Sequence, residues 1–516
     1  GATLQGKDSS MLRHFITTFL MVTFQLLLAA IAVAEVKLPQ VLGEHMVLQR
    51  DQPITLWGTA SPGEEVSVTL GQETQKTVTD PHGHWLVRMN PRPASDQPTT
   101  LTVAASNTIT LTDVLIGEVW LCSGQSNMHW PIKQSDDGEA DAAHANLPNV
   151  RLLNLRGSPY PNGREFTEQE LATCKPEKYL SGNWAACSTE TASEFSAVAF
   201  YFGRELHGKL NVPVGLIHNA IGGTPTEAWI SREALESDPA LRPLLGDWFN
   251  NELVHSFCRD RAAFNLREAI DKKVLDKRQY RHPYQPGFMF EAGIAPLAPF
   301  SIRGVIWYQG ESNAHNSSLH DKLLPALIAE WRRVWGQGDF PFLYVQLPNI
   351  ASVEEWPEFR ESQRRASRIA HTGMAVTIDI GDPADVHPRR KGEVGHRLAL
   401  LARAMAYGEE IEFSGPRLEA VIAAGNRLRL SFSHTAGGLM TKDNEEFGGF
   451  EVAGSDNVFA PATAEREGDE IILFSSQVEE PVAVRYAFTP NPRCVLVNGD
   501  RLPASPFTAH LRRGDD

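Results

Sequence analysis

From residue 35 to about residue 112, apolar and polar positions alternate in short runs that Pro, Gly and Asp turns separate. A period of two places every second side chain on one face, which is typical of β-strands with one buried side. The clearest runs are 54–57, 65–70, 85–89 and 100–104. We interpret His82 and His84, which fall in one of the turns, as surface residues. The pattern predicts a small N-terminal β-sandwich.

Between residues 113 and 410 the pattern changes to continuous apolar runs that alternate with longer amphipathic segments. Such runs are typical of strands buried on both faces, and their alternation with helices predicts a parallel sheet covered on both sides. The expected strands are 114–122, 150–153, 214–218, 302–308, 342–346 and 375–380. The main expected helices are 195–210, 319–335 and 389–407.

A helical and highly charged stretch at about 231–283 interrupts this alternation, and we interpret it as a solvated insertion beside the sheet. After residue 411 the short alternating runs return, at 428–432, 470–474, 482–487 and 495–496. The sequence therefore predicts an α/β domain over 113–410, flanked by β-domains over 35–112 and 411–516.

Ser126 lies in the polar turn Ser123-Gly124-Gln125-Ser126-Asn127, directly after the first apolar strand of the α/β domain. A Gly-flanked serine on a sharp strand-to-helix turn presents its hydroxyl to substrate and is a candidate nucleophile. Ser, Gly and Asn also occur in such turns for backbone reasons alone. The turn by itself leaves both interpretations open.

Two further polar turns strengthen the catalytic interpretation. The turn Gln309-Gly310-Glu311-Ser312-Asn313 closes the strand 302–308, and Asp385-Val386-His387-Pro388 follows the strand 375–380. The carboxyl ends of parallel strands meet at one edge of the sheet, so these turns can form one site.

Composition limits the classes of function. With 516 residues, 42% hydrophobic and 22% charged, the chain fits a globular protein of two or three domains. A formal net charge of -15 opposes nucleic-acid binding, which needs a basic face, and is explained by solubility.

Residues 11–34 have the pattern of an export signal. Met11 is followed by Arg13 and His14, then by a mostly apolar stretch and the small residues Ala32-Val33-Ala34. We expect cleavage before Glu35, with residues 1–10 as an upstream extension, and a secreted or periplasmic mature protein. A membrane anchor is the competing interpretation, but polar residues interrupt the stretch and no second span follows.

The chain has five cysteines, so at least one must be unpaired. Cys174 and Cys187 lie close together in a loop-rich stretch and are the most plausible disulfide pair. Cys122 is interpreted as a small buried residue. No cysteine pair has the spacing of a zinc site, so neither a structural metal nor a cofactor is expected.

Several motifs in order resemble the sialate O-acetylesterase family of SGNH-type carbohydrate esterases. They are the serine turn, the run Ile221-Gly222-Gly223-Thr224-Pro225-Thr226-Glu227-Ala228-Trp229, the turn 307–314, His387-Pro388, and the runs 449–454 and 502–507. The resemblance covers nearly the whole mature chain and implies an SGNH-hydrolase-like three-layer parallel sheet flanked by β-sandwiches. It implies a secreted serine esterase that removes O-acetyl groups from sialic acid or from an acetylated plant polysaccharide or oligosaccharide.

Ester cleavage needs a nucleophile, a base and donors for the oxyanion. The resemblance assigns Ser126 as nucleophile, His387 as base and Asp385 as the group that orients the imidazole. The expected oxyanion donors are the backbone N–H groups of Ser126 and Gly223 and the side chain of Gln309, which stands where the broader SGNH group has Asn. Pro388 is expected to start the following helix.

The chain departs from the broader pattern at three positions. Ala384 stands where SGNH esterases usually have the orienting aspartate, so a Ser-His dyad oriented by a backbone carbonyl remains open beside the Asp385 triad. His129 and Ile221 stand where relatives often have an acid and a Trp, which leaves the substrate undecided.

Residues near the motifs are candidates for binding the sugar: Asn127, Trp229, Glu311 and Asn313. Glu311 and Asn313 are equally well explained as anchors of their own loop. Of the nearby aromatic residues we expect at least two in the core: Trp130, Trp229, Trp307 and Tyr308.

Two alternatives belong to other classes. A non-catalytic carbohydrate-binding protein on an esterase fold is opposed by the intact serine, glutamine and histidine. The other is a short-chain lipase-like esterase or a lipase acting on long acyl chains. A lipase of that kind would need a wide apolar groove with a lid, and no segment of the sequence identifies one.

Overall fold

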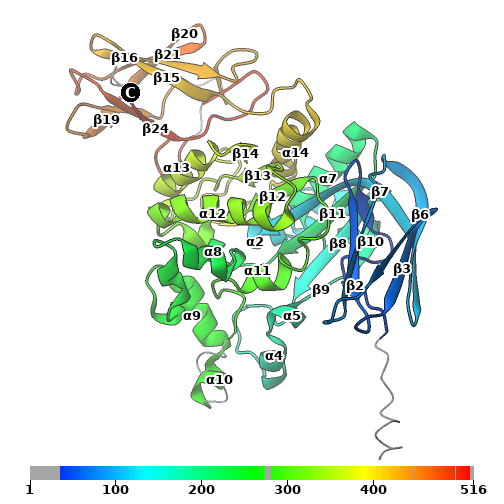
Figure 1. Cartoon of the computed structure of the whole chain (residues 1–516). Helices are drawn as coiled ribbons and strands as arrows, with labels where there is room; N and C mark the ends of the chain where they lie inside the picture. Colours follow the sequence, from blue (N-terminus) through cyan, green and yellow to red (C-terminus); the bar gives the residue numbers. More distant parts are fainter. Residues whose placement is uncertain (1–34, 273–280, 444–445, 494–495, 512–516) are drawn as a thin grey trace, which may run out of the picture.

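The computed structural model describes residues 35–272, 281–443, 446–493 and 496–511 (Figure 1). The expected export signal and part of the charged insertion lie outside these ranges. Within them, no helix has both the length and the apolar character needed to cross a membrane.

One long strand, β7 (Thr108–Gly124), joins the N-terminal β-region to the central sheet. Its first half pairs with β6 (Ser95–Ala104), and its second half lies between β11 and β12 of the central sheet. The predicted domain boundary near residue 112 therefore falls inside a continuous strand. The other strands of this region are β1 (Val47–Gln49), β2 (Ile54–Thr59), β3 (Glu65–Leu70), β4 (Glu73–Val78) and β5 (His84–Met89).

The central sheet has the order β10-β8-β11-β7-β12-β13-β14, and every strand except β10 is parallel to its neighbours on this path. Its strands are β8 (Leu147–Gly157), β10 (Trp184–Cys187), β11 (Val214–Ala220), β12 (Gly304–Tyr308), β13 (Phe342–Val345) and β14 (Thr372–Ala375). The short strand β9 (Leu180–Ser181) pairs with β8. The predicted parallel sheet is present, with one antiparallel strand at its edge.

Helices cover both faces of this sheet (Figure 1). Alternate residues of β7 divide between two cores: Trp120 and Cys122 belong to one, and Val119 and Leu121 to the other. The first core contains α7 (Ala197–Leu210) and α14 (Lys391–Tyr407). The second contains α11 (Phe288–Gly293) and α12 (Ser317–Trp335), beside α13 (Trp356–Ala366). Burial on both faces explains why the strands are continuous apolar runs.

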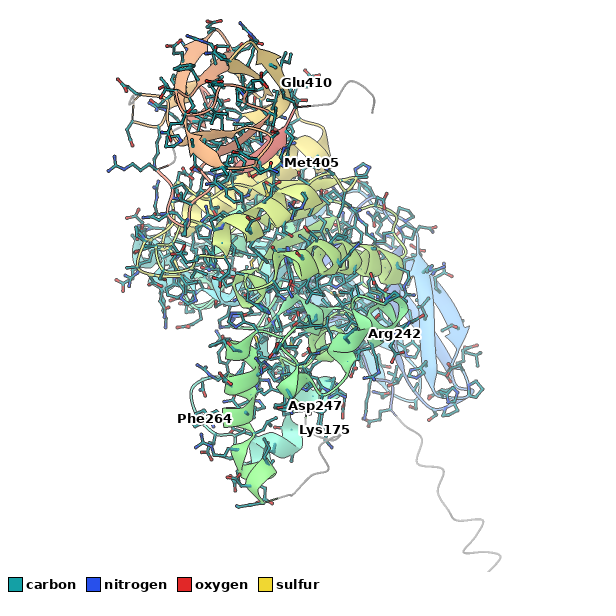
Figure 2. All side chains as sticks on the ribbon, turned by 90° about the vertical axis from the view of Figure 1, so that its left-hand side faces the viewer. Lys175, Arg242, Asp247, Phe264, Met405 and Glu410 are labelled. Carbon is teal, nitrogen blue, oxygen red and sulfur yellow. The ribbon has the colours of Figure 1, made fainter. Side chains whose placement is uncertain are left out.

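The described part of the insertion after β11 is helical, as expected, and projects from one end of the molecule (Figure 1). It contains α8 (Arg232–Ser237), α9 (Ser256–Asn265) and α10 (Arg267–Asp271). Figure 2 shows Arg242, Asp247 and Phe264 at this end, with Lys175 close by. The described residues also form the short α-helices α2 (Ser126–His129), α3 (Gly138–Ala143), α4 (Glu168–Thr173), α5 (Pro176–Tyr179) and α6 (Thr189–Ala192).

The C-terminal region contains two four-stranded antiparallel sheets, ordered β15-β16-β21-β20 and β19-β18-β22-β24, and the pair β17-β23. Their bounds are β15 (Arg417–Ala424), β16 (Arg427–Ser433), β17 (Met440–Thr441), β18 (Phe450–Ala453), β19 (Phe459–Pro461), β20 (Thr463–Glu467), β21 (Glu470–Phe474), β22 (Ala483–Tyr486), β23 (Leu496–Val497) and β24 (Phe507–His510). Met405 and Glu410 mark the connection into this region (Figure 2).

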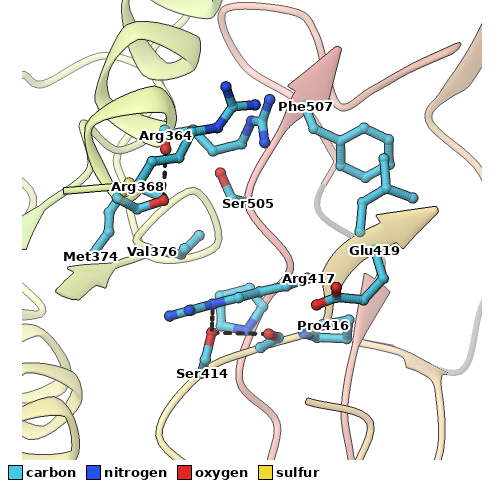
Figure 3. A pocket seen from close by; sticks show the side chains of 14 residues that line it. Arg364, Arg368, Met374, Val376, Ser414, Pro416, Arg417, Glu419, Ser505 and Phe507 are labelled. Atoms are coloured by element: carbon cyan, nitrogen blue, oxygen red, sulfur yellow. Dashed lines mark hydrogen bonds between the residues drawn. The ribbon is translucent and has the colours of Figure 1, made fainter. Parts of the chain in front are cut away.

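Specific contacts fix the C-terminal region against the α/β part. Gln346 donates through Nε2 to Ser505 Oγ at 2.9 Å, and the buried Arg360 donates to the Pro490 carbonyl at 2.5 Å. Figure 3 shows a pocket at this junction, with a cavity volume of about 230 Å³, lined in part by Arg364, Arg368 and Arg417. None of its lining residues belongs to the three polar turns, so it is separate from the predicted site.

The structure corrects three sequence-based expectations. The strand expected at 375–380 is instead β14, Thr372–Ala375, because its pairing with β13 ends at Ala375. Pro388 does not start the next helix, since α14 begins at Lys391. Cys174 and Cys187 are both free, because they are buried in different cores.

Candidate active site

The serine turn, the Gly222-Gly223 turn and the Gln309 turn follow the carboxyl ends of β7, β11 and β12, which are adjacent in the sheet. Ser126 is the first residue of α2. Gly124 before it has φ +142°, and a Cβ there would lie 2.1 Å from the Tyr308 carbonyl oxygen. Only glycine fits this close approach, and the sharp turn that results places Ser126 at the edge of the sheet.

Ser126 and His387 form a hydrogen bond, with 2.9 Å between Ser126 Oγ and His387 Nε2. The fold brings them together from the ends of β7 and of the segment after β14. The Trp130 ring stacks on the imidazole with its centroid 5.0 Å away and an interplanar angle of 18°. The nucleophile and base assigned from the sequence are therefore in contact.

The environment of His387 favours a neutral imidazole. Burial lowers the pKa of His387, the charge of Lys391 lowers it further, and Asp385 partly opposes both effects. A neutral imidazole can accept the proton of the Ser126 hydroxyl, whereas an imidazolium cannot.

Asp385 lies beside His387 but does not hold it closely. Its Oδ1 is 3.5 Å from His387 Nδ1, and its side chain is 47% exposed. The same oxygen accepts a hydrogen bond from the backbone N–H of His387 at 2.8 Å. Asp385 therefore shapes the turn that carries His387, and this geometry is compatible with both the triad and the dyad.

The glycine turn after β11 lies beside the serine. Gly223 has φ +78°, and a Cβ there would lie 2.2 Å from the Tyr284 hydroxyl, so only glycine fits. The Gly222 N–H donates to the Tyr160 hydroxyl at 3.1 Å. Among the described residues, the backbone N–H groups of Ser126 and Gly223 have no hydrogen-bond acceptor. These two are therefore free to donate to a ligand.

Gln309 is buried in a network of its own loop. Its Nε2 donates to Asn313 Oδ1 at 2.7 Å and to the Thr224 carbonyl at 3.3 Å. Its Oε1 accepts from Thr226 Oγ1 at 2.7 Å. Both amide hydrogens are thus engaged, and donation to an oxyanion would require this side chain to turn.

Asn313 anchors the same network. Its Nδ2 donates to Glu227 Oε2 at 2.8 Å, and the residue is buried, with 1% of its surface exposed. Burial raises the pKa of Glu227 to about 7. Of the two interpretations weighed for Asn313, the structure provides contacts only for the loop anchor.

Asn127 links three parts of the site. Its Nδ2 donates to Glu311 Oε1 and, at 3.0 Å, to the Val386 carbonyl next to His387. Its Oδ1 accepts from Lys391 Nζ. Asn127 and Lys391 are both fully buried, so this is an internal contact rather than a sugar-binding surface.

The aromatic residues near the motifs are mostly in the core, as expected. Trp229, Trp307 and Tyr308 are buried, and Trp229 packs edge-on against Trp307. Trp229 Nε1 donates to Thr224 Oγ1 at 3.0 Å. The structure therefore gives Trp229 a packing role, and its candidate role in stacking on sugar is not supported by any exposed surface.

The two other departures from the family pattern are also internal. Ile221 is fully buried. The His129 ring lies between those of Tyr160 and His218, with centroids 5.4 and 5.3 Å away. Burial lowers the pKa of His129 to about 4, so it is neutral.

Sequence analysis missed Lys391. It follows Arg389 and Arg390 in a run that has the pattern of a solvated charge cluster, and no feature of the sequence distinguishes it.

No group of three or more His, Cys, Asp or Glu residues within the described ranges is arranged to hold a metal ion.

Comparisons with known proteins identify the family to which this chain belongs. The family model described as "Carbohydrate esterase, sialic acid-specific acetylesterase" matches residues 282–405. The sialate O-acetylesterase of Mus musculus is 31% identical, covering 91% of this chain and 93% of the relative, and that of Homo sapiens is 30% identical, covering 91% and 92%. A crystal structure of a carbohydrate acetylesterase from Xanthomonas citri is 33% identical with a TM-score of 0.76, covering 92% of this chain and 99% of that one. On these grounds the chain belongs to the sialate O-acetylesterase family, whose activity is the removal of O-acetyl groups from carbohydrates.

Proposed function

We propose that the chain is a serine esterase that deacetylates a carbohydrate through an acetyl-enzyme intermediate. The observation that carries the proposal is the 2.9 Å hydrogen bond between Ser126 Oγ and His387 Nε2 at the carboxyl edge of the sheet. The helices on both faces of that sheet support assignment to an SGNH-type fold with flanking β-sandwich domains. The export pattern in residues 11–34 supports a secreted or periplasmic protein.

In the proposed mechanism, His387 Nε2 takes the proton of Ser126 as the hydroxyl oxygen attacks the acetyl carbonyl. The tetrahedral intermediate collapses, His387 protonates the departing sugar oxygen, and acetyl-Ser126 remains. Water then attacks the acetyl-enzyme with His387 again as base, and acetate leaves. Asp385 helps to orient the imidazole.

The proposed oxyanion donors are the backbone N–H groups of Ser126 and Gly223, which are free in this structure. Losing one such donor typically costs about 3 kcal/mol of transition-state stabilisation. Gln309 is a third donor only if its amide leaves Asn313 and Thr224. Until then its hydrogen bond to Thr224 holds the segment that follows Gly223.

Phe257, on α9 of the insertion, is the proposed contact for the sugar. Its side chain is 41% exposed, and its Cε1 atom would be 3.0 Å from a Cβ added to Gly223. The ring therefore lies next to Gly223. The Arg261 guanidinium carbon is 5.1 Å from the centroid of the same ring. An exposed aromatic ring beside the oxyanion site suits stacking on a sugar, and a nearby guanidinium suits a carboxylate such as that of sialic acid.

The primary test is acetate release from an aryl acetate and from acetylated glycans. Ser126→Ala and His387→Ala are expected to reduce turnover below detection while leaving the melting temperature unchanged. Ser318→Ala, an exposed serine on α12, is the matched control and is expected to retain full activity. Turnover by the Ser126→Ala protein would refute the nucleophile assignment. A panel containing O-acetylated sialic acid and acetylated xylan or xyloglucan then identifies the glycan.

A further inference from the structure

A fully buried lysine lies next to the catalytic pair, and the mechanism above does not use it. Lys391 is the first residue of α14 and has 0% exposed surface. Burying an ammonium group is strongly unfavourable unless partners compensate for the lost water. A lysine in this position therefore requires an explanation beyond packing.

The partners of Lys391 all belong to the active site. Its Nζ donates to Asn127 Oδ1, the residue directly after the nucleophile. Its Nζ also lies 5.3 Å from the centroid of the Tyr308 ring and 5.8 Å from that of Trp130. The Trp130 ring in turn stacks on the imidazole of His387.

Asn127 transmits the contact to the loop that carries the base. Its Nδ2 donates to the carbonyl of Val386, the neighbour of His387, at 3.0 Å, and also to Glu311 Oε1. The other carboxylate oxygen, Glu311 Oε2, is buried and has no hydrogen-bond partner among the described residues. One asparagine thus joins the serine turn, the histidine loop, the Glu311 turn and α14.

We propose that Lys391 is a positioning residue of the esterase: by fixing the Asn127 carboxamide, it holds the His387 loop at hydrogen-bonding distance from Ser126. The inference rests on the proposed serine mechanism. It assigns the Lys391-Asn127-Glu311 chain to catalysis rather than to folding alone.

The charge of Lys391 has a second effect that can be measured. The charged groups that act on His387 are Asp385, which raises its pKa, and Lys391, which lowers it in addition to burial. The groups that act on Lys391 are Glu311 and Asp385, while burial lowers the pKa of Lys391 to about 7. Below that pH the lysine is charged and opposes protonation of the imidazole. Removing the charge therefore raises the pKa of His387.

Two substitutions separate positioning from charge. Lys391→Met has a similar length and neither donor nor charge, whereas Lys391→Gln can still donate to Asn127 Oδ1 but is neutral. For Lys391→Met, assayed below pH 7 where Lys391 is charged, we expect kcat on an aryl acetate to fall roughly tenfold to a hundredfold, as for loss of a charged hydrogen bond. Lys391→Gln is expected to recover part of that loss. In both variants the acid limb of the pH profile of kcat/KM is expected to move to higher pH.

Lys322→Met, a solvent-exposed lysine on α12, is the matched control and is expected to keep the kcat and the pH profile of the unmodified enzyme. Melting temperatures show whether each variant folds. If Lys391→Met does not fold, kcat and the pH profile of Lys391→Gln provide the test. Wild-type kcat and an unmoved acid limb in a folded Lys391 variant would overturn the inference. A lower kcat with an unmoved limb in Lys391→Gln would also overturn it, since a merely structural residue gives that result. If Ser126→Ala remained active, the proposed mechanism itself would have failed instead.

Discussion

The contribution of Asp385 can be calculated from its geometry. In a triad with a buried aspartate, removing the carboxylate charge costs about 10⁴ in kcat. Here the Asp385 side chain is 47% exposed and its Oδ1 is 3.5 Å from His387 Nδ1. At that distance, with the water-like dielectric that such exposure requires, two unit charges interact by just over 1 kcal/mol. The charge is therefore worth about sevenfold in rate.

Asp385 also accepts the backbone N–H of His387 at 2.8 Å, and losing that hydrogen bond adds about 1 kcal/mol. Asp385→Asn, whose Oδ1 can still accept this hydrogen bond, is expected to lower kcat/KM about sevenfold. Asp385→Ala loses both interactions and is expected to lower it about fortyfold. Because Asp385 raises the pKa of His387, both changes are expected to move the acid limb to lower pH, opposite to the Lys391 variants.

The assay is the pH profile of kcat/KM with an aryl acetate, measured for both variants beside the unmodified enzyme. A loss of a thousandfold or more in Asp385→Asn would refute this reasoning and establish a tightly coupled triad. Identical rates for all three proteins would also refute it, and would favour a dyad in which Asp385 has no part.

The other predictions concern the pocket around the acetyl group and the sugar. In a series of aryl esters from acetate to octanoate, kcat/KM is expected to fall steeply with chain length, and constant rates would favour the lipase-like alternative. Phe257→Ala is expected to raise KM for the acetylated glycan severalfold with little change for an aryl acetate, and equal effects on both substrates would contradict the stacking role. Gly223→Ala is expected to lower the melting temperature as well as activity, because its φ of +78° and the Tyr284 hydroxyl 2.2 Å from the new Cβ both oppose a side chain. Chemical modification under native conditions is expected to leave Cys122, Cys174, Cys187 and Cys258 largely unreacted, since all are buried, and rapid labelling of these thiols would contradict the packing.

The apolar pattern predicted the central strands because it records burial. β11 and the second half of β7 are continuous apolar runs, and both are buried on two faces. The same reasoning failed at residues 376–380, where Ile378 and Ile380 are buried although their backbone pairs with no strand in the described part of the chain. An apolar run shows that a segment lies inside the protein, but hydrogen bonding to a neighbour decides whether it is a strand.

At the site, too, the local sequence pattern predicted some features and could not predict those that depend on distant contacts. Ser126 and His387 were identified because glycine, serine and a histidine-proline pair occur at strand ends in the family pattern. The internal role of Asn313 and the burial of Trp229 depend on partners such as Glu227 and Trp307, which lie far away in the sequence. A local pattern does not contain those contacts, so exposure could not be predicted at these positions.

Lys391 and Glu311 are the clearest examples of internal contacts that a local sequence pattern does not contain. A charged residue in a sequence is normally interpreted as solvated, because burying its charge is unfavourable. Lys391 is nevertheless fully buried, and its hydrogen bond to Asn127 joins positions separated by 264 residues. The free energy lost in burying this charge is offset only where Asn127, Glu311 and two aromatic faces converge, which is at the catalytic pair. Buried charges that the sequence does not reveal are therefore the positions at which the structure adds most to an account of catalysis.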